Sequence, residues 1–440
     1  MAAGSKTLAN RILAGLIIGA LAGVLILFVG ARAPAVLQWS QTLAVWILDP
    51  LGQVFLRMLF FVVIPLVFVL LAGAVMSLGG SGKLGPIALR TFPLFFLNMA
   101  IAVTLGLVMM NVVRPGEHMA HETRERLMAE FGSATHSVAP TTTTTTAFTP
   151  AGVVDMLMPR NLFGAFVGNR RDALGEVLPL IVFAILVGVA GTRLQESRRR
   201  SLQEGLATIA ELMSGIVHLA LKLAPYAVPA MIFSVVVKAG VDVLLALGLF
   251  VLGCGAALLL HLFGTMSLWL RFLTDRGPLE TFKGMREALI TAFSTSSSTA
   301  TLPTALTVAR EQLGISESTS GFVLPLGTTM NTSGSALYEG CVVLFIAQVF
   351  GVHLTIPEQI SLLLMSVVTA TAVAGIPGGS LPLIAGLLAT FGIPPEGIGI
   401  VLGADRLLDM TRTMVSVGSD IVTCAVVDAS MQRAKVSEAS

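Results

Sequence analysis

Long apolar runs recur along the whole chain, and they constrain its fold more than any other feature. They lie near residues 12–30, 43–78, 91–113, 178–192, 204–237 and 240–272. Most of them are long enough to cross a bilayer core of about 30 Å as a helix. Only 12% of the residues are charged, whereas an ordinary soluble chain carries about 25%. The sequence therefore predicts an all-α multi-pass membrane protein.

The basic residues predict the orientation of the chain. If eight helices span the membrane, one side receives Lys6, Arg11, Lys83, Arg90, the run 193–200, the basic residues of 271–286, Arg433 and Lys435. Positive residues concentrate on the cytoplasmic side of membrane proteins. We expect both termini there, in a cell (plasma or inner) membrane, with residues 431–440 as a tail. Residues 114–177 should form an extracytoplasmic loop and the start of the fourth helix. A signal peptide is the alternative for the first run, which is longer than a usual signal core.

The cysteines and histidines give no sign of a metal centre. Cys254, Cys341 and Cys424 lie in apolar runs without CxxC spacing, and the six histidines form no HExxH pattern. We expect no organic cofactor and no nucleic-acid partner.

Three apolar stretches are interrupted by small and polar residues. They are "TAFSTSSSTATLPTAL" (291–306), "LPLGTTMNTSGSALYEG" (324–340) and "TAVAGIPGGSLPLIAG" (371–386). Non-helical backbone inside a bilayer is tolerated only where protein or a water-filled cavity satisfies its polar groups. Paired broken segments therefore favour a binding site near the midplane, although kinked packing helices are an alternative. Exposed carbonyls together with a carboxylate such as Asp420 would suit a small cation such as Na⁺.

The segment "DRLLDMTRTMVSVGSD" (405–420) carries a polar stripe on an apolar helix. Its members fall within an arc of about 100°; they are Asp405, Asp409, Arg412, Thr413, Ser416 and Asp420. An ionisable group inside a membrane span costs roughly 2.5–3.5 kcal/mol on insertion scales, so it normally has a function there. Arg412 offers a fork of donors to a carboxylate, and Asp409 can accept from an ammonium. The stripe fits a small zwitterion with an additional carboxylate.

Four motifs, in order, resemble the dicarboxylate/amino acid:cation symporter family, the glutamate transporters. They are "STSSSTATLP", "GTTMNTSGSALYEG", "AVAGIPGGS" and "DRLLDMTRTMVSVGSD". The resemblance implies eight transmembrane helices, two re-entrant helical hairpins near 280–306 and 358–392, and a homotrimer. It also implies a scaffold of helices 1, 2, 4 and 5 (1–78 and 178–239). A mobile transport domain of helices 3, 6, 7, 8 and the hairpins (79–113 and 240–430) would cross the membrane as an elevator.

The same resemblance implies roles for individual residues. The substrate site would include Ser297, Ser298, Ala374, Gly375, Asp409, Arg412, Thr413 and Ser416. One sodium site would use Asn331 and Asp420 with carbonyls near Gly327 and Ser416. A second would use Thr329 and carbonyls near Ala370, Thr371 and Val373.

The sequence also departs from the family pattern. Groups expected around a third sodium ion are replaced by Phe95, Asn98, Met99 and Ser333, so that site should be weakened or absent. Glu339 stands where proton-coupled relatives have Glu and others have Gln. A neutral acid is cheaper to bury than a carboxylate, so we expect Glu339 to carry a proton. A Glu in a wet vestibule or tied to an Arg is the alternative.

These residues favour import of acidic amino acids, glutamate or aspartate, coupled to sodium and/or protons. By resemblance, dicarboxylate carriers lack the acid at Asp409, and neutral amino acid exchangers lack the Arg at 412. A C4-dicarboxylate:cation symporter is the nearest alternative, and a passive channel is another. An intramembrane serine hydrolase is more distant, because His218 and His261 lie on apolar helices without a nucleophile elbow. We therefore expect a transporter and not an enzyme.

Overall fold

The computed structural model describes residues 2–78, 85–119, 125, 161–163, 177–371, 373 and 378–439. Most of the predicted extracytoplasmic loop lies outside these ranges. Within them the secondary structure is helical, without strands. The first helices are α1 (Ala2–Gly30), α2 (Pro34–Leu43), α3 (Asp49–Phe61), α4 (Val63–Leu78), α5 (Gly85–Val113), α9 (Val177–Thr192) and α10 (Glu196–Ala239). Those that follow are α11 (Asp242–Leu259), α12 (Met266–Leu273), α13 (Pro278–Gly284), α14 (Arg286–Thr295) and α15 (Ser298–Thr307). The last are α16 (Glu317–Met330), α17 (Ser333–Val349), α18 (Ile356–Ala370), α19 (Leu381–Thr390) and α20 (Leu402–Ala439).

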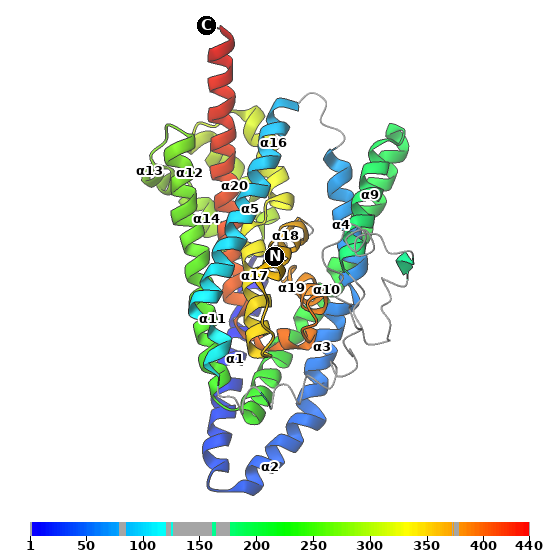
Figure 1. Cartoon of the computed structure of the whole chain (residues 1–440), viewed down its shortest axis with the longest axis vertical. Helices are drawn as coiled ribbons and strands as arrows, with labels where there is room; N and C mark the ends of the chain where they lie inside the picture. The colour runs from blue at the N-terminus through cyan, green and yellow to red at the C-terminus, as the bar shows by residue number, and fades with distance from the viewer. Residues whose placement is uncertain are drawn as a thin grey trace.

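Short segments of other helical geometry join some of these helices. The wider π-type turns are η1 (Ala44–Leu48), η4 (Leu260–Thr265) and η5 (Val308–Gln312), and the tighter 3-10 turns are η2 (Pro115–His118) and η6 (Pro395–Ile400). The predicted C-terminal tail is not separate from the helices, because α20 continues to Ala439 and projects beyond its neighbours (Figure 1).

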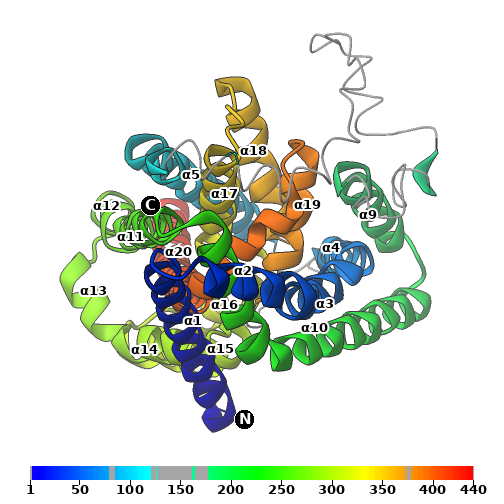
Figure 2. The same cartoon turned by 90° about the horizontal axis from the view of Figure 1, so that it is seen from below.

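The helices pack around two centres. α10 contacts α1, α3 and α4, and α4 lies against α9. α20 contacts α11, α12, α14, α16 and α17, and α17 lies against α5. Figure 2 shows α3, α4 and α9 on the opposite side of the molecule from α11, α12 and α13. Contacts between the two sides include those of α1 with α20, of α10 with α11, α20 and η6, and of α19 with α3 and α4. The division into a scaffold and a transport domain, and their relative movement, stay predictions.

The apolar helices confirm the multi-pass class in a coarse form. By length and composition, four described helices can cross a membrane: Pro86–His118, Asp242–Leu273, Glu317–Val349 and Leu402–Ala434. A fifth span is possible if the bent pair Glu196–Val217 and Lys222–Lys238 acts as one. Shorter apolar helices at Ala14–Gly30, Ile64–Gly73 and Val182–Thr192 cover the remaining predicted spans. The count of eight therefore stays a prediction.

All three interrupted stretches leave helical geometry where the sequence predicts it. α14 and α15 form a helix–turn–helix whose turn places Ser296 at φ 51°, a left-handed conformation that strains a non-glycine residue. α16 ends at Met330, and α17 begins at Ser333. α18 and α19 form the second helical pair and lie in contact with each other. The breaks are therefore real features of the fold, although their depth in a bilayer is a proposal.

Gly334 brings the backbones of α17 and α20 together. A Cβ atom at this position would lie 2.1 Å from the Arg412 carbonyl oxygen, far inside contact distance. The first turn of α17 therefore lies directly against the polar stripe of α20, and only glycine permits this approach.

We predict that Gly334→Ala lowers the melting temperature of the purified protein, because the backbone of α17 or α20 must shift. Overpacking of this kind costs about 1–3 kcal/mol. Gly205→Ala is the matched control, since nothing lies within 4 Å of its added Cβ and alanine favours a helix. The melting temperatures of both variants are measured by thermal unfolding in detergent, with size-exclusion chromatography as the detection method. Equal melting temperatures would contradict the close approach.

Candidate functional site

The polar stripe of α20 is buried inside the protein. Asp405, Asp409, Arg412, Ser416 and Asp420 are all buried, and Thr413 is half-buried. Thr413 donates its hydroxyl to the Asp409 carbonyl oxygen at 2.8 Å. A helix whose polar face is turned away from lipid, as the sequence predicts, keeps these charges among protein groups.

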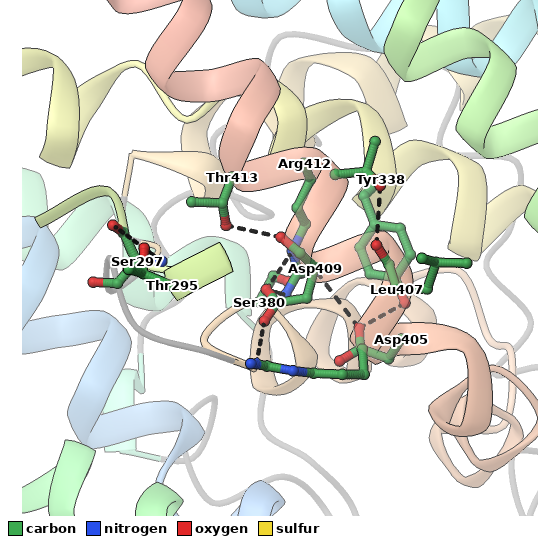
Figure 3. A network of polar contacts seen from close by, with 11 residues as sticks. Thr295, Ser297, Tyr338, Ser380, Asp405, Leu407, Asp409, Arg412 and Thr413 are labelled. Atoms are coloured by element: carbon green, nitrogen blue, oxygen red, sulfur yellow. Dashed lines mark hydrogen bonds and ion pairs between the residues drawn. The ribbon is translucent and has the colours of Figure 1, made fainter. Parts of the chain in front are cut away.

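Arg412 is the centre of a polar network at this stripe (Figure 3). Its Nε and Nη2 donate to Asp409 Oδ1 at 2.9 and 2.6 Å. Its Nη1 donates to the Ser380 hydroxyl at the start of α19 and lies 3.6 Å from Asp405 Oδ1. The guanidinium carbon is 4.7 Å from the centre of the Tyr338 ring, a cation–π contact. The structure thus pairs the two residues that the sequence assigns to opposite ends of a substrate.

Sequence reasoning missed two members of this network. Tyr338 on α17 donates its hydroxyl to Asp405 Oδ1 at 2.8 Å and is fully buried. Ser380 precedes α19 and is also fully buried. The signal for Tyr338 was its position one turn after Gly334. Ser380 ends the motif "AVAGIPGGS", but nothing in the sequence connected its hydroxyl with Arg412.

The serine-rich turn of the first helical pair lies beside the break of α16. Ser297 caps α15 by accepting from the Ala300 backbone N–H at 3.2 Å. Ser298 donates to the Thr328 carbonyl oxygen at 3.2 Å. These serines are therefore fixed by backbone contacts. The predicted residues Ala374 and Gly375 lie outside the described residues.

The expected sodium ligands Asn331 and Asp420 are brought together. Asn331 Nδ2 donates to Asp420 Oδ1 at 2.8 Å, and the Asn331 backbone N–H donates to the Gly327 carbonyl oxygen at 2.9 Å. A Cβ on Gly327 would lie 2.5 Å from Asp420 Oδ1, so glycine lets the carboxylate approach the backbone. Ser416 Oγ accepts from the Gly334 N–H at 3.1 Å. This group is rich in the hard oxygen atoms that a small cation prefers.

The second expected set is less compact. The Thr329 side chain is exposed and donates to the Leu326 carbonyl oxygen of its own helix at 2.9 Å. The Ala370 carbonyl oxygen accepts from the Thr332 hydroxyl. Thr371 donates to the Val368 carbonyl oxygen at 2.7 Å, and Val373 is buried. The structure therefore links the Ala370 carbonyl to Thr332 at the α16–α17 break, whereas the Thr329 hydroxyl bonds within its own helix.

The residues that replace the expected third-site groups are uncharged and buried. Asn98 Nδ2 on α5 donates to Asn331 Oδ1 at 2.9 Å. The Ser333 and Ser419 hydroxyls lie 2.8 Å apart, and Phe95 and Met99 are buried apolar neighbours on α5. A neutral amide donor thus satisfies the Asn331 side-chain carbonyl.

Glu339 is completely buried and contacts the second helical pair. Its Oε2 lies 2.6 Å from Thr369 Oγ1, which also lies 2.8 Å from the Met365 carbonyl oxygen. A hydroxyl has one hydrogen, and a backbone carbonyl has none to give. Both contacts are satisfied together when Glu339 is the neutral acid and donates to Thr369. Complete burial excludes the wet vestibule considered for this residue.

Broken helices thus pack around a buried, paired arginine. The model of the sodium:dicarboxylate symporter family matches residues 8–430, and the chain belongs to this family. It is a secondary transporter and not an enzyme, so the serine hydrolase alternative is wrong.

Individual relatives fall into two groups by name. The chain is 32% identical to the proton/sodium-glutamate symport protein of Bacillus caldotenax over 410 residues, which cover 93% of this chain and 91% of that protein. It is 30% identical to the proton/glutamate-aspartate symporter of Escherichia coli, over 88% of this chain and 85% of that protein. It is 28% identical to the C4-dicarboxylate transport protein of an Anaeromyxobacter species, over 96% of this chain and 89% of that protein.

Proposed function

We propose that this protein imports acidic amino acids, glutamate or aspartate, in symport with sodium ions and/or protons. The observation that carries the proposal is the buried pair of Arg412 and Asp409 on α20. The names of the glutamate and glutamate–aspartate relatives support the same substrate class.

The charges of this pair favour a substrate with matching groups. An acidic amino acid can give its side-chain carboxylate to Arg412 and its ammonium to Asp409, so that both protein charges remain paired. A neutral amino acid would leave Arg412 without a new partner, and a dicarboxylate would bring no ammonium to replace Arg412 at Asp409 Oδ1. A buried charge that loses its partner is strongly unfavourable. A C4-dicarboxylate symporter remains the second candidate, supported by the relatives of that name.

The other predicted substrate residues complete this proposal. The turn at Ser297 and Ser298, the Thr413 and Ser416 hydroxyls, and the backbone at Ala374 and Gly375 would surround the backbone groups of the amino acid. Thr413 already contacts the Asp409 carbonyl oxygen. Ser416 is held by the Gly334 N–H, which limits its freedom to reach a substrate carboxylate.

Sodium would bind as a co-substrate at Asn331 and Asp420 with the carbonyls near Gly327 and Ser416. A second ion would use Thr329 and the carbonyls near Ala370, Thr371 and Val373. The replacements at Phe95 and Met99 support the loss of a third ion, because these two buried side chains offer no oxygen ligand. Glu339 would supply a proton in its place, since its contacts with Thr369 fit the neutral acid.

We further propose that the chain forms a homotrimer in the cell membrane with both termini in the cytoplasm. The helices around α10 would form the fixed scaffold, and those around α17 and α20 would move as the transport domain. The two packing groups support this division.

We predict that Arg412→Cys abolishes uptake of acidic amino acids and admits neutral ones such as serine. Removing one partner of a buried charge pair costs about 3–5 kcal/mol. Asp409→Asn should instead impair aspartate uptake more than succinate uptake. Reconstituted uptake of labelled aspartate, glutamate, serine and succinate measures all of these effects. Retained aspartate affinity in Arg412→Cys would refute the assignment.

We predict that fewer than three sodium ions accompany each substrate, because Asn98, Phe95, Met99 and Ser333 replace the expected third-site groups. Reversal potentials in proteoliposomes give the stoichiometry directly. Asp420→Asn should weaken the remaining sodium dependence. A measured ratio of three would disprove the loss of the site, and uptake that ignores sodium would remove Asn331 and Asp420 from this role.

We predict that Glu339→Gln preserves substrate binding and exchange but makes net uptake insensitive to an imposed pH gradient, because the amide imitates the permanently neutral acid. Uptake into proteoliposomes between about pH 5.5 and 8 tests this, in a range where a carrier acid must titrate. Glu317→Gln is the control, since the Glu317 side chain is 83% exposed. A wild-type response to pH in Glu339→Gln would leave Glu339 with a structural role only.

A further inference from the structure

Asp409 contacts two arginines, one on each of its carboxylate oxygens. Arg412 donates to Oδ1 through Nε and Nη2 at 2.9 and 2.6 Å. Arg406, three positions earlier on α20, places Nη1 3.3 Å from Oδ2. The Asp409 side chain is only 4% exposed, and the Arg406 side chain is 11% exposed. The roles considered so far make no use of Arg406.

A bound substrate would affect the two arginines differently. If the substrate carboxylate takes Arg412, the Oδ1 atom of Asp409 is released, but Arg406 can stay on Oδ2. Asp409 then keeps a cationic partner whether or not the substrate brings an ammonium. Arg406 therefore reduces the disadvantage of a substrate that has two carboxylates and no amine.

The total charge of the ionisable residues around Asp409 also indicates that Arg406 favours binding of a dicarboxylate. Asp405, Asp409, Arg406 and Arg412 sum to zero, and an acidic amino acid adds one negative charge whereas a C4-dicarboxylate adds two. Coulomb interaction is proportional to charge. Loss of Arg406 would therefore weaken binding of the dicarboxylate more than binding of the amino acid.

We propose that Arg406 is a specificity-determining residue that lowers the preference of this transporter for acidic amino acids over C4-dicarboxylates. It does so by holding Asp409 in place of the substrate ammonium. The inference rests on the proposed function, because it assumes that Arg412 binds a substrate carboxylate. It adds a second arginine to the site and predicts that wild-type protein binds both substrate classes.

The test compares competition by succinate with competition by unlabelled aspartate, against uptake of labelled aspartate into proteoliposomes. Arg406→Gln should raise the ratio of the succinate inhibition constant to the aspartate inhibition constant by about tenfold, a moderate effect for the loss of one charge beside a buried carboxylate. Arg406→Met keeps the apolar stem without the charge and should give the same change. Arg406→Lys keeps the charge and should give a smaller change.

Arg433→Gln is the matched control. Arg433 also lies on α20, but its side chain is 55% exposed and pairs with Asp275, so its removal should leave the ratio unchanged. An unchanged or lowered ratio in both Arg406→Gln and Arg406→Met would overturn the inference. If one of these variants fails to fold, the other decides. Wild-type protein that takes up neither aspartate nor succinate would instead refute the proposed function and leave no ratio to compare.

Discussion

A buried charge must remain paired, and this constraint organises the structure around α20. Arg412 is held by Asp409 on its own helix, by Ser380 before α19 and by the Tyr338 ring on α17. Ser380 and Tyr338 come from segments next to helix breaks, since Ser380 precedes α19 and Tyr338 lies near the start of α17. Since an unpaired guanidinium would destabilise the interior, the same contacts that satisfy the charge also fix the positions of the broken helices.

Polar backbone groups at the helix breaks near Arg412 are hydrogen-bonded by side chains of neighbouring segments. The Ser298 hydroxyl meets the Thr328 carbonyl, the Thr332 hydroxyl meets the Ala370 carbonyl, and the Gly334 N–H meets Ser416. Open helix ends need such partners where water is excluded. The two helical pairs, the α16–α17 break and α20 thus form one connected unit, in which a displacement of any member disturbs several hydrogen bonds.

The sequence was sufficient for features that depend on local patterns. The spacing from Asp405 to Asp420 predicted a one-sided polar helix, and the small residues around Asn331 predicted the break. Contacts between distant segments have no such periodicity, so the meetings of Asn98 with Asn331 and of Ser380 with Arg412 were not foreseen. The spans were also less regular than expected, because the runs before residue 240 fold into helices of very different length. The stripe pattern does not include Arg406, because this residue lies beside the stripe and reaches Asp409 only through its long side chain.

Thr369 on α18 has a single hydroxyl hydrogen, so the ionisation state of Glu339 determines whether this hydroxyl can donate to its own helix. When Thr369 donates to the Met365 carbonyl one turn earlier, it makes the kind of back-bond that bends helices. If Glu339 were ionised, its carboxylate would accept the Thr369 hydroxyl hydrogen, and the Met365 carbonyl would lose this hydrogen bond. The end of α18 would then straighten by a small angle. Loss of one proton inside the protein would thus act on the last turn of α18, which ends at Ala370.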